Sequence, residues 1–282
     1  MYFLNINKPK GITSFDVIRI LRKKLKIKQI GHSGTLDPLA SGVIQVGVGA
    51  CTKLLDYLDS DKEYVASLKF GFVTDTFDDE GEKIFVKKPE FNKNDLIQVL
   101  NSFLGKTKQI PPKYSAIKQN GMKLCDLVRQ NRASEIKEFE RDIEIYSIEL
   151  LEFNGFDEVK IKVNCKKGTY IRSLANDIGQ KLSCGAYLTD LKRTKAGNFK
   201  IENSDDLSKD DFNEINPINV LNFDKKELNE QEYKLISNGN FIKQDRNFKT
   251  DFILLTKNNK LVSIAILSDN LIKPKKFFKE EV

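Results

Sequence analysis

The chain of 282 residues is 40% apolar and 10% aromatic, which suffices for a large hydrophobic core and excludes an intrinsically disordered protein. Its 47 Lys and Arg residues outnumber the 40 Asp and Glu residues, and the net charge of +7 is compatible with a polyanionic partner such as nucleic acid. One histidine and four cysteines without a CxxC pair exclude a His/Cys zinc site of the usual spacing. No apolar run reaches signal-peptide length or the ~18 residues of a membrane span, so we expect a cytoplasmic protein.

The N-terminal part of the chain alternates between β-prone and helical patterns. Residues 2–6 form a β-prone run. Residues 13–28 predict a helix, which begins with a capping box formed by Thr13 and Asp16. Residues 42–58 then predict a buried strand that continues into a second helix.

The next segments predict a strand, a polar loop and a helix. Apolar and polar residues alternate over 62–72, as expected of a strand. The acidic segment 74–84 lacks the ligand pattern of a calcium-binding loop, so a solvated turn is the better interpretation. A helix is predicted within 91–105, and either Asn92 or Asn94 is its expected cap.

Residues 106–141 differ in character from the segments on either side. They are basic and only weakly periodic, and Pro111, Pro112 and Gly121 interrupt them. This composition predicts an excursion from the core. The excursion carries five cations of interest: Lys113, Lys118, Lys123, Arg129 and Arg132.

Regular structure resumes after this excursion. Two strands are predicted within 142–171, and a helix follows over 172–182. Near the C-terminus, two β-prone runs within 252–267 are joined by a turn at Asn258 and Asn259, which predicts a hairpin. The last part of the chain is therefore expected to be a small all-β module, too short to be stable without a neighbour.

The segment GHSGTLDPLASGV, residues 31–43, contains the only histidine of the chain, His32, and a single carboxylate, Asp37. It is either an ordinary turn, in which Asp37 caps a helix or a turn, or a place where backbone and substrate come close. Motifs of nucleotide and hydrolase chemistry are missing elsewhere. GVGACTK departs from G-x-G-x-x-G at Thr52, and neither a P-loop nor a G-x-S-x-G nucleophile elbow is present.

Small residues give this loop its expected shape. Gly31, Gly34 and Gly42 lack a Cβ atom, so we expect the loop to bend sharply and to let a substrate approach the backbone. Pro38 stiffens the chain beside Asp37. The loop is thus predicted to keep the carboxylate aimed before the substrate arrives.

Six segments occur in order between about residues 4 and 200, with spacing similar to that of one enzyme family. They are NKPKGITSFDVI, GHSGTLDPLASGVIQVGVGACTKL, DKEYVASLKFG, IPPKYSAIKQNGMKLCDLVR, CKKGTYIRSLANDIG and CGAYLTDLKRTKAG. The chain is thereby identified as a member of the TruB family, the bacterial tRNA pseudouridine-55 synthases. These enzymes isomerise one uridine in the T-arm loop of tRNA.

The resemblance implies an α+β fold, with a mixed, mainly antiparallel sheet, flanking helices and a thumb-like, RNA-gripping insertion over about 106–141. It implies a catalytic domain over 1–225 and a small PUA-like RNA-binding β domain over 226–282. It also implies tRNA as the partner, bound through the T-arm stem-loop, without a cofactor or a metal. We expect the protein to act as a monomer.

The resemblance also implies roles for individual residues. Asp37 is the catalytic carboxylate, and Arg172 pairs with it. Tyr64 stacks on the extruded base, while His32 fills the space that the flipped nucleotide leaves. Three further residues line or flank the pocket: Tyr170, Leu191 and Lys8. Without the resemblance, Tyr64 would be interpreted as a core aromatic, His32 as a turn residue and Arg172 as a surface cation at a helix start.

The implied chemistry is consistent with these residue types. Pseudouridine formation breaks the N1–C1′ bond, turns the base and rejoins it through C5, so no group is supplied or removed and no cofactor is needed. An aspartate is ionised at neutral pH and can hold the substrate covalently, by attack on the sugar or on the base. Two alternatives remain: a pseudouridine synthase acting on another RNA, and a non-catalytic RNA-binding or tRNA-folding protein on the same scaffold.

The chain departs from the family pattern in a few places. Ala50 and Cys51 stand where the family usually carries glutamate and alanine, and we expect consequences for packing there. The second half of the insertion, NRASEIKEFER, is less regular than is typical. The resemblance is weak beyond residue 200.

Overall fold

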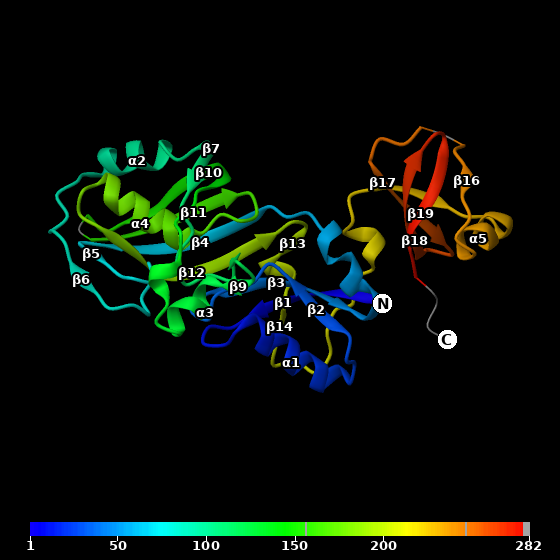
Figure 1. The fold of residues 1–282 in the computed structure, drawn as a ribbon, viewed down its shortest axis with the longest axis horizontal. Coiled ribbons are helices and arrows are strands. Elements are labelled where there is room, and N and C mark those ends of the chain that lie inside the picture. Colours follow the sequence, from blue (N-terminus) through cyan, green and yellow to red (C-terminus); the bar gives the residue numbers. More distant parts are fainter. Residues whose placement is uncertain (156, 246, 279–282) are drawn as a thin grey trace.

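A ten-stranded mixed sheet forms the larger part of the molecule (Figure 1). The structure is a computed structural model that describes residues 1–155, 157–245 and 247–278. The strands of this sheet follow the order β14-β1-β3-β12-β4-β11-β10-β7, with β2 beside β3 and β13 beside β12. Their bounds are β1 (Tyr2–Lys8), β2 (Ile30–Ser33), β3 (Ser41–Val48), β4 (Lys62–Phe70), β7 (Gly105–Gln109), β10 (Arg141–Phe153), β11 (Glu158–Cys165), β12 (Ala186–Ala196), β13 (Phe199–Lys200) and β14 (Asp205–Asp206).

Most neighbouring strands of the sheet are antiparallel; the pairs β1–β14 and β3–β12 are parallel. One edge of β3 pairs with β1 along its length. The other edge pairs with β12 only at Ser41 and Gly42, and with β2 from Gln45 to Val48. The strands β2 and β12 therefore separate along this edge of β3. We call the place where they separate the fork.

Three α-helices pack on the main sheet, and local sequence accounts for where they begin. The helix α1 (Ser14–Leu25) starts with the predicted capping box of Thr13 and Asp16. Asn92 caps α2 (Lys93–Asn101), which settles the choice between the two predicted caps. The helix α4 (Ile171–Lys181) packs against one face of the sheet and forms a hydrophobic cluster with residues of β4, β11 and β12.

Some local predictions need correction or refinement. The segment after β3 forms a 3-10 helix, η1 (Gly49–Tyr57), with Cys51 in the core between the two sheets. The remaining short elements around the main sheet are β5 (Phe72–Val73), β6 (Ile84–Phe85), η3 (Ile201–Asn203) and η4 (Pro217–Asn219).

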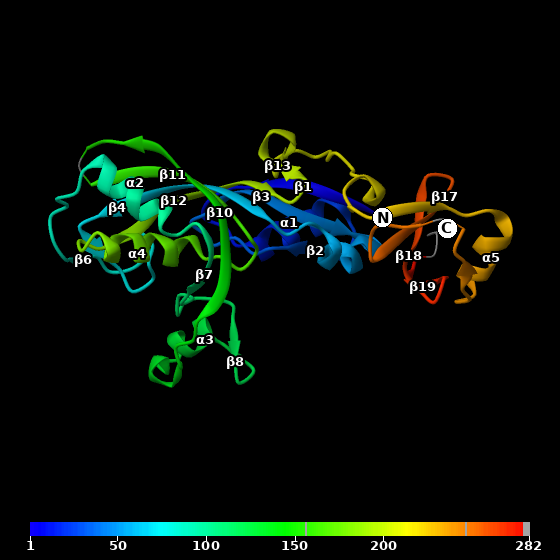
Figure 2. The ribbon, with the colours of Figure 1, turned by 90° about the horizontal axis from the view of Figure 1, so that it is seen from above.

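The predicted excursion projects from the sheet between β7 and β10 (Figure 2). Because β7 belongs to the main sheet, the projecting part comprises residues 110–140. It contains a two-stranded ribbon and two short helical segments, which are β8 (Lys118–Gln119), β9 (Met122–Lys123), α3 (Leu124–Arg129) and η2 (Ala133–Glu135). We call this part the insertion.

A second sheet of five strands lies at one end of the molecule (Figure 1). Its strands are β15 (Asp224–Glu227), β16 (Ile242–Lys243), β17 (Phe252–Lys257), β18 (Lys260–Ser268) and β19 (Leu271–Phe277). The predicted hairpin is present, since β17 and β18 pair and both Asn258 and Asn259 adopt left-handed φ angles at the turn. The prediction of an all-β module is wrong, because α5 (Glu230–Ser237) also belongs to it.

The two sheets share one hydrophobic cluster. Leu254 and Ile264 of the C-terminal sheet pack in it with Phe3 and Leu54. The small module is therefore supported by the rest of the chain, as its length requires. The last four residues of the predicted C-terminal domain, 279–282, lie outside the described residues.

Candidate active site

The loop between β2 and β3, residues 34–40, carries Asp37 and is tied to the first residue of α1 and to the segment before that helix. The Oγ atom of Ser14 donates to the carbonyl oxygen of Leu36 at 3.1 Å and accepts from its N–H at 2.8 Å. The N–H of Gly11 donates to the carbonyl oxygen of Pro38 at 2.8 Å. These bonds hold the backbone on both sides of Asp37, so the loop needs little ordering when a substrate binds.

Arg172 makes an ion pair with Asp37 from the first turn of α4. Its Nε atom lies 2.9 Å from Oδ2 of Asp37, and Arg172 is only 5% exposed. The rest of the guanidinium is also engaged: Nη1 contacts Oδ2 of Asp78 at 3.2 Å and donates to the carbonyl oxygen of Thr76 at 3.1 Å. Nη2 donates to the carbonyl oxygen of Tyr114 at 2.9 Å. One planar side chain thus connects the Asp37 loop, the acidic segment and the base of the insertion.

Asp78 is a site residue that sequence reasoning missed. The segment 74–84 was expected to be a solvated turn, which is wrong for Asp78, because that residue is buried against Arg172. Its Oδ1 atom accepts from the hydroxyl of Thr76 at 2.6 Å and from the N–H of Glu80 at 3.1 Å. The segment contains several acids, and nothing in their spacing marks the one that faces the guanidinium.

Two opposing influences act on the Asp37 carboxyl. The side chain of Asp37 is 37% exposed, so solvent still reaches the carboxyl group. Desolvation by the surrounding protein raises the pKa of Asp37 above its ordinary value, while the Arg172 guanidinium acts in the opposite direction. Arg172 therefore favours the ionised form that a nucleophile needs.

Two of the predicted pocket residues, Tyr64 and Leu191, lie on the apolar side of the site, and a third, Tyr170, lies just before α4. Tyr64 on β4 and Leu191 on β12 belong to the same core cluster as Leu36 of the Asp37 loop. Tyr64 is 8% exposed, and desolvation raises the pKa of its hydroxyl. Tyr170 is half-buried just before α4, where Gln109 of β7 bonds its backbone N–H at 2.8 Å and its carbonyl at 3.0 Å.

Lys8 is completely buried, at the end of β1. Its Nζ atom donates to the carbonyl oxygens of Pro9 at 2.9 Å and Ile12 at 2.7 Å, and it lies 3.5 Å from that of Pro38. Burial lowers the pKa of Lys8 to about 8, and the charge of Asp37 opposes this shift. These contacts place Lys8 beneath the Asp37 loop and hold it to backbone oxygens.

His32 is half-buried in β2, opposite Val46 of β3, so it belongs to a short strand and not to the loop itself. Its Nδ1 atom is buried and has no hydrogen-bond partner within the described part of the chain. Desolvation lowers the pKa of His32, and the nearby charge of Arg193 lowers it further. His32 is therefore neutral at neutral pH.

Two of the three glycines around the loop agree with the expected sharp bend, since Gly34 and Gly42 have φ angles of +72° and +105°. Gly31 lies in β2, where a Cβ atom would be 3.5 Å from Leu55, an ordinary contact. Gly42 has φ +105°, and a Cβ atom there would lie 2.2 Å from the carbonyl oxygen of Arg193. Its small size thus permits the close approach of β3 to β12.

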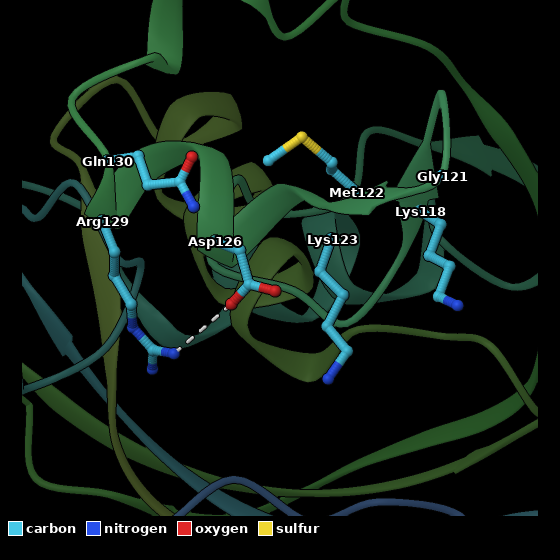
Figure 3. A pocket seen from close by; sticks show the side chains of 7 residues that line it. All are labelled: Lys118, Gly121, Met122, Lys123, Asp126, Arg129 and Gln130. Atoms are coloured by element: carbon cyan, nitrogen blue, oxygen red, sulfur yellow. Dashed lines mark ion pairs between the residues drawn. The ribbon is translucent and has the colours of Figure 1, made fainter.

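The insertion carries a basic pocket of about 480 Å³ (Figure 3). Three of the predicted cations line it, Lys118, Lys123 and Arg129. The one carboxylate of the pocket, Asp126, lies 3.7 Å from Arg129. The pocket therefore keeps an excess of positive charge at the surface.

Neither a metal site nor a membrane segment is found in the part of the chain that the structure describes. No group of three or more His, Cys, Asp or Glu side chains there is arranged to hold a metal ion. Its helices are all too short or too polar to cross a membrane.

Comparisons with known proteins agree on one family. Residues 22–171 match the family model of the TruB family pseudouridylate synthase N-terminal domain, and residues 172–227 match that of the tRNA pseudouridylate synthase B C-terminal domain. The chain is 43% identical to the tRNA pseudouridine synthase B of Clostridium kluyveri over 98% of each chain. It is 44% identical to that of Fusobacterium nucleatum over 97% of this chain and 98% of the relative.

Solved structures share the fold at lower identity. One is a chain in the structure of an H/ACA RNP bound to a substrate RNA containing 2′-deoxyuridine, with a TM-score of 0.72 and 23% identity. Another belongs to a Cbf5-Nop10-Gar1 complex, with a TM-score of 0.72 and 24% identity. Each match covers 99% of this chain and 85% of the other. The α+β fold with a mixed sheet and a C-terminal curled sheet is therefore confirmed, whereas the PUA-like assignment stays a prediction.

Proposed function

Because the chain belongs to the TruB family of pseudouridylate synthases and forms pseudouridine in tRNA, we propose that its target is the uridine at position 55 of the T-arm loop and that Asp37 is the catalytic nucleophile. The single observation that carries the role of Asp37 is its ion pair, at 2.9 Å, with the buried Arg172. We further propose that the protein acts as a monomer in the cytoplasm.

The reaction is an isomerisation in which the atoms of the nucleotide are conserved. An oxygen of Asp37 forms a covalent bond to the substrate, either at C1′ of the ribose or on the uracil ring. The N1–C1′ bond breaks, the base turns, and C5 bonds to C1′. On the ribose route the new C5–C1′ bond displaces the Asp37 oxygen from C1′, and on the uracil route Asp37 leaves the ring once that bond has formed; either way the carboxylate is regenerated. C5 loses its proton, and N1 gains one.

Arg172 orients the nucleophile. A closed pocket excludes water, and a carboxylate without a partner would then take up a proton. The guanidinium keeps Asp37 ionised and aimed, while Asp78 and two backbone carbonyls prevent Arg172 from rotating away. Asp78 is therefore a positioning residue, which acts through Arg172.

The uridine must leave its stack before it reaches Asp37, at a cost of a few kcal/mol. Stacking on an aromatic face offsets about 1–3 kcal/mol of this cost, and Tyr64 supplies that face, with Leu191 and Tyr170 around it. Tyr64 is 8% exposed, so binding of the base requires its neighbours to move. His32, neutral and half-buried, fills the gap in the RNA loop.

The insertion contributes affinity. Its basic pocket suits phosphate groups, whose contacts strengthen binding and make it salt-dependent without selecting a sequence. Selection of the T-arm comes from the shape of its loop and from its unstacked bases. Lys8 acts indirectly, by holding the backbone beneath Asp37.

The test uses an unmodified tRNA transcript without added cofactor. The wild-type protein is expected to convert uridine 55 alone, as read by site-specific mapping of pseudouridine. Asp37→Asn should abolish conversion while the transcript still binds. Asp79→Asn is the matched control, because that exposed carboxylate pairs only with Lys83 at 2.8 Å. Conversion by Asp37→Asn, or modification at another site or in another RNA, would contradict the proposal.

A further inference from the structure

Two buried cations at the fork have no carboxylate partner. Lys62, the first residue of β4, is 7% exposed, and Arg193 on β12 is 1% exposed. Within the described residues, no carboxylate oxygen lies within 4.0 Å of the charged nitrogens of either side chain. By contrast, the buried Arg172 has two carboxylates.

All of the contacts that hold these two cations are with neutral atoms. Arg193 donates from Nε to the carbonyl oxygen of Val43 at 2.7 Å and from Nη2 to that of Gly34 at 2.8 Å. The Nζ atom of Lys62 reaches Oε1 of Gln45 at 3.4 Å. A Cβ atom on Gly34 would lie 3.4 Å from Nη1 of Arg193 and 3.5 Å from Cε of Lys62, so both cations lie directly beneath the Asp37 loop.

The charges around the Asp37 loop therefore do not balance. Four buried cations, Lys8, Lys62, Arg172 and Arg193, lie around this loop, and the carboxylates in direct contact with them are Asp37 and Asp78. Asp59 and Asp61 act on Lys62 only from beyond ion-pair distance. A buried cation without a counter-ion is unfavourable, and such a group is retained where it meets an anion. In agreement with this, desolvation and the charge of Arg193 lower the pKa of Lys62 to about 8, although the more distant Asp59 and Asp61 oppose the shift.

Lys62 also borders a hollow of about 290 Å³ that is open to solvent. The other lining residues come from the turn before β4 and from β10, β11 and β12, and all of them are polar: Asp61, Tyr146, Ser147, Asn164 and Lys195. The Asp61 carboxylate accepts a hydrogen bond from the hydroxyl of Tyr146 at 3.1 Å, on the other side of the hollow. The hollow thus brings together an exposed lysine, a buried lysine, the Asp61 carboxylate and neutral polar side chains, so positive charge is in excess there.

We propose that this hollow is a subsite for a backbone phosphate of the substrate RNA, next to the flipped nucleotide. Lys62 and Lys195 supply the direct contacts, and Arg193 adds positive charge from beneath Gly34. Gly34, which lies against Cε of Lys62, is three positions before Asp37, so the two Cα atoms are at most about 10 Å apart. We therefore assign a phosphate held by Lys62 to the strand that enters the active site. This inference rests on the proposed function, because it assumes an RNA whose base reaches Asp37.

The test measures the salt dependence of RNA affinity. Asp37→Asn serves as the parent, so that the unmodified tRNA transcript is not converted during the titration. Adding Lys62→Met should weaken binding about tenfold at low salt and reduce the slope of log affinity against log salt by about one. Lys195→Met should reduce the slope in the same way, and its exposed position leaves the core intact. Circular dichroism checks that each variant is folded.

Lys69→Met is the matched control. It removes the same charge from the same strand, but Lys69 already pairs with Asp157 at 2.8 Å and Glu158 at 2.9 Å. Its slope should equal that of the parent. An unchanged slope in both Lys62→Met and Lys195→Met, or an equal change in Lys69→Met, would overturn the subsite. Failure of the wild-type protein to convert uridine 55 in the same transcript would instead refute the proposed function.

Discussion

Replacing Lys62 with methionine should stabilise the protein, because it removes a buried charge while keeping most of the side-chain volume. Desolvation lowers the pKa of Lys62 from its ordinary value of 10.5 to about 8 in the folded protein. At about 1.36 kcal/mol per pKa unit, this difference corresponds to about 3 kcal/mol of lost stability when the lysine is charged in both states. Lys62 is 7% exposed, so solvent screening removes little of this cost.

The pH dependence identifies the charge as the cause. Below pH 8 the folded and unfolded states both bind the proton, and the full cost is present. Between pH 8 and 10.5 only the unfolded state binds it, so the stability of the wild-type protein rises toward that of Lys62→Met. Above 10.5 neither state is charged, and the difference due to charge disappears. Other titrating groups are common to both proteins and cancel in the comparison.

Urea unfolding at pH 7 and at pH 10, followed by circular dichroism because the chain has no tryptophan, measures this difference. The gain in free energy of unfolding should be about 3 kcal/mol at pH 7 and below about 1 kcal/mol at pH 10. Lys69→Met, which removes a partly exposed, ion-paired lysine, should change stability by less than about 1 kcal/mol. A gain for Lys62→Met that is equal at both pH values, or a loss at pH 7, would refute the reasoning.

Three more predictions concern the active site. Asp78→Asn should lower kcat about 10–100-fold with little change in tRNA affinity, measured by single-turnover conversion and filter binding, because the positioning charge beside the guanidinium is lost. Burial raises the pKa of Asp37, and activity is lost when its carboxylate gains a proton. The fall of kcat/KM on the acid side of the pH profile should therefore occur at a higher pH than an exposed aspartate would give. A midpoint at or below pH 3.8 would contradict this. Gly42→Ala should lower the free energy of unfolding in urea by about 3 kcal/mol or more, because the added Cβ atom would lie 2.2 Å from the carbonyl oxygen of Arg193. Gly31→Ala should lower it much less, and equal losses in the two variants would count against that contact.

Several local features could be predicted from the sequence, because the residues that cause them are neighbours in the chain. Thr13 and Asp16 are three positions apart, and their reciprocal bonds start α1 as expected. Asn258 and Asn259 tolerate left-handed φ angles, so they turn β17 into β18. The family, the α+β fold and the activity also followed from ordered sequence motifs.

Other local predictions failed where the tertiary surroundings decided the outcome. The acidic segment 74–84 has the composition of a solvated turn, yet Arg172, which lies 94 positions after Asp78, draws that one acid into the interior. Gly31 and Gly42 look equivalent in the loop sequence. Only the pairing of β3 with β12 shows that, of these two glycines, Gly42 is the one that must lack a side chain.

The sequence by itself therefore determined the family, the order of the elements and the residue types available for chemistry, because short-range patterns and motifs record these directly. Only the tertiary structure decided which charges are paired. Arg172 forms ion pairs with Asp37 and Asp78, while Lys62 and Arg193 form hydrogen bonds only to neutral oxygen atoms at the fork. The physical reason is that the energy of a charge depends on burial and on atoms within a few ångströms, and strands distant in the sequence supply those atoms.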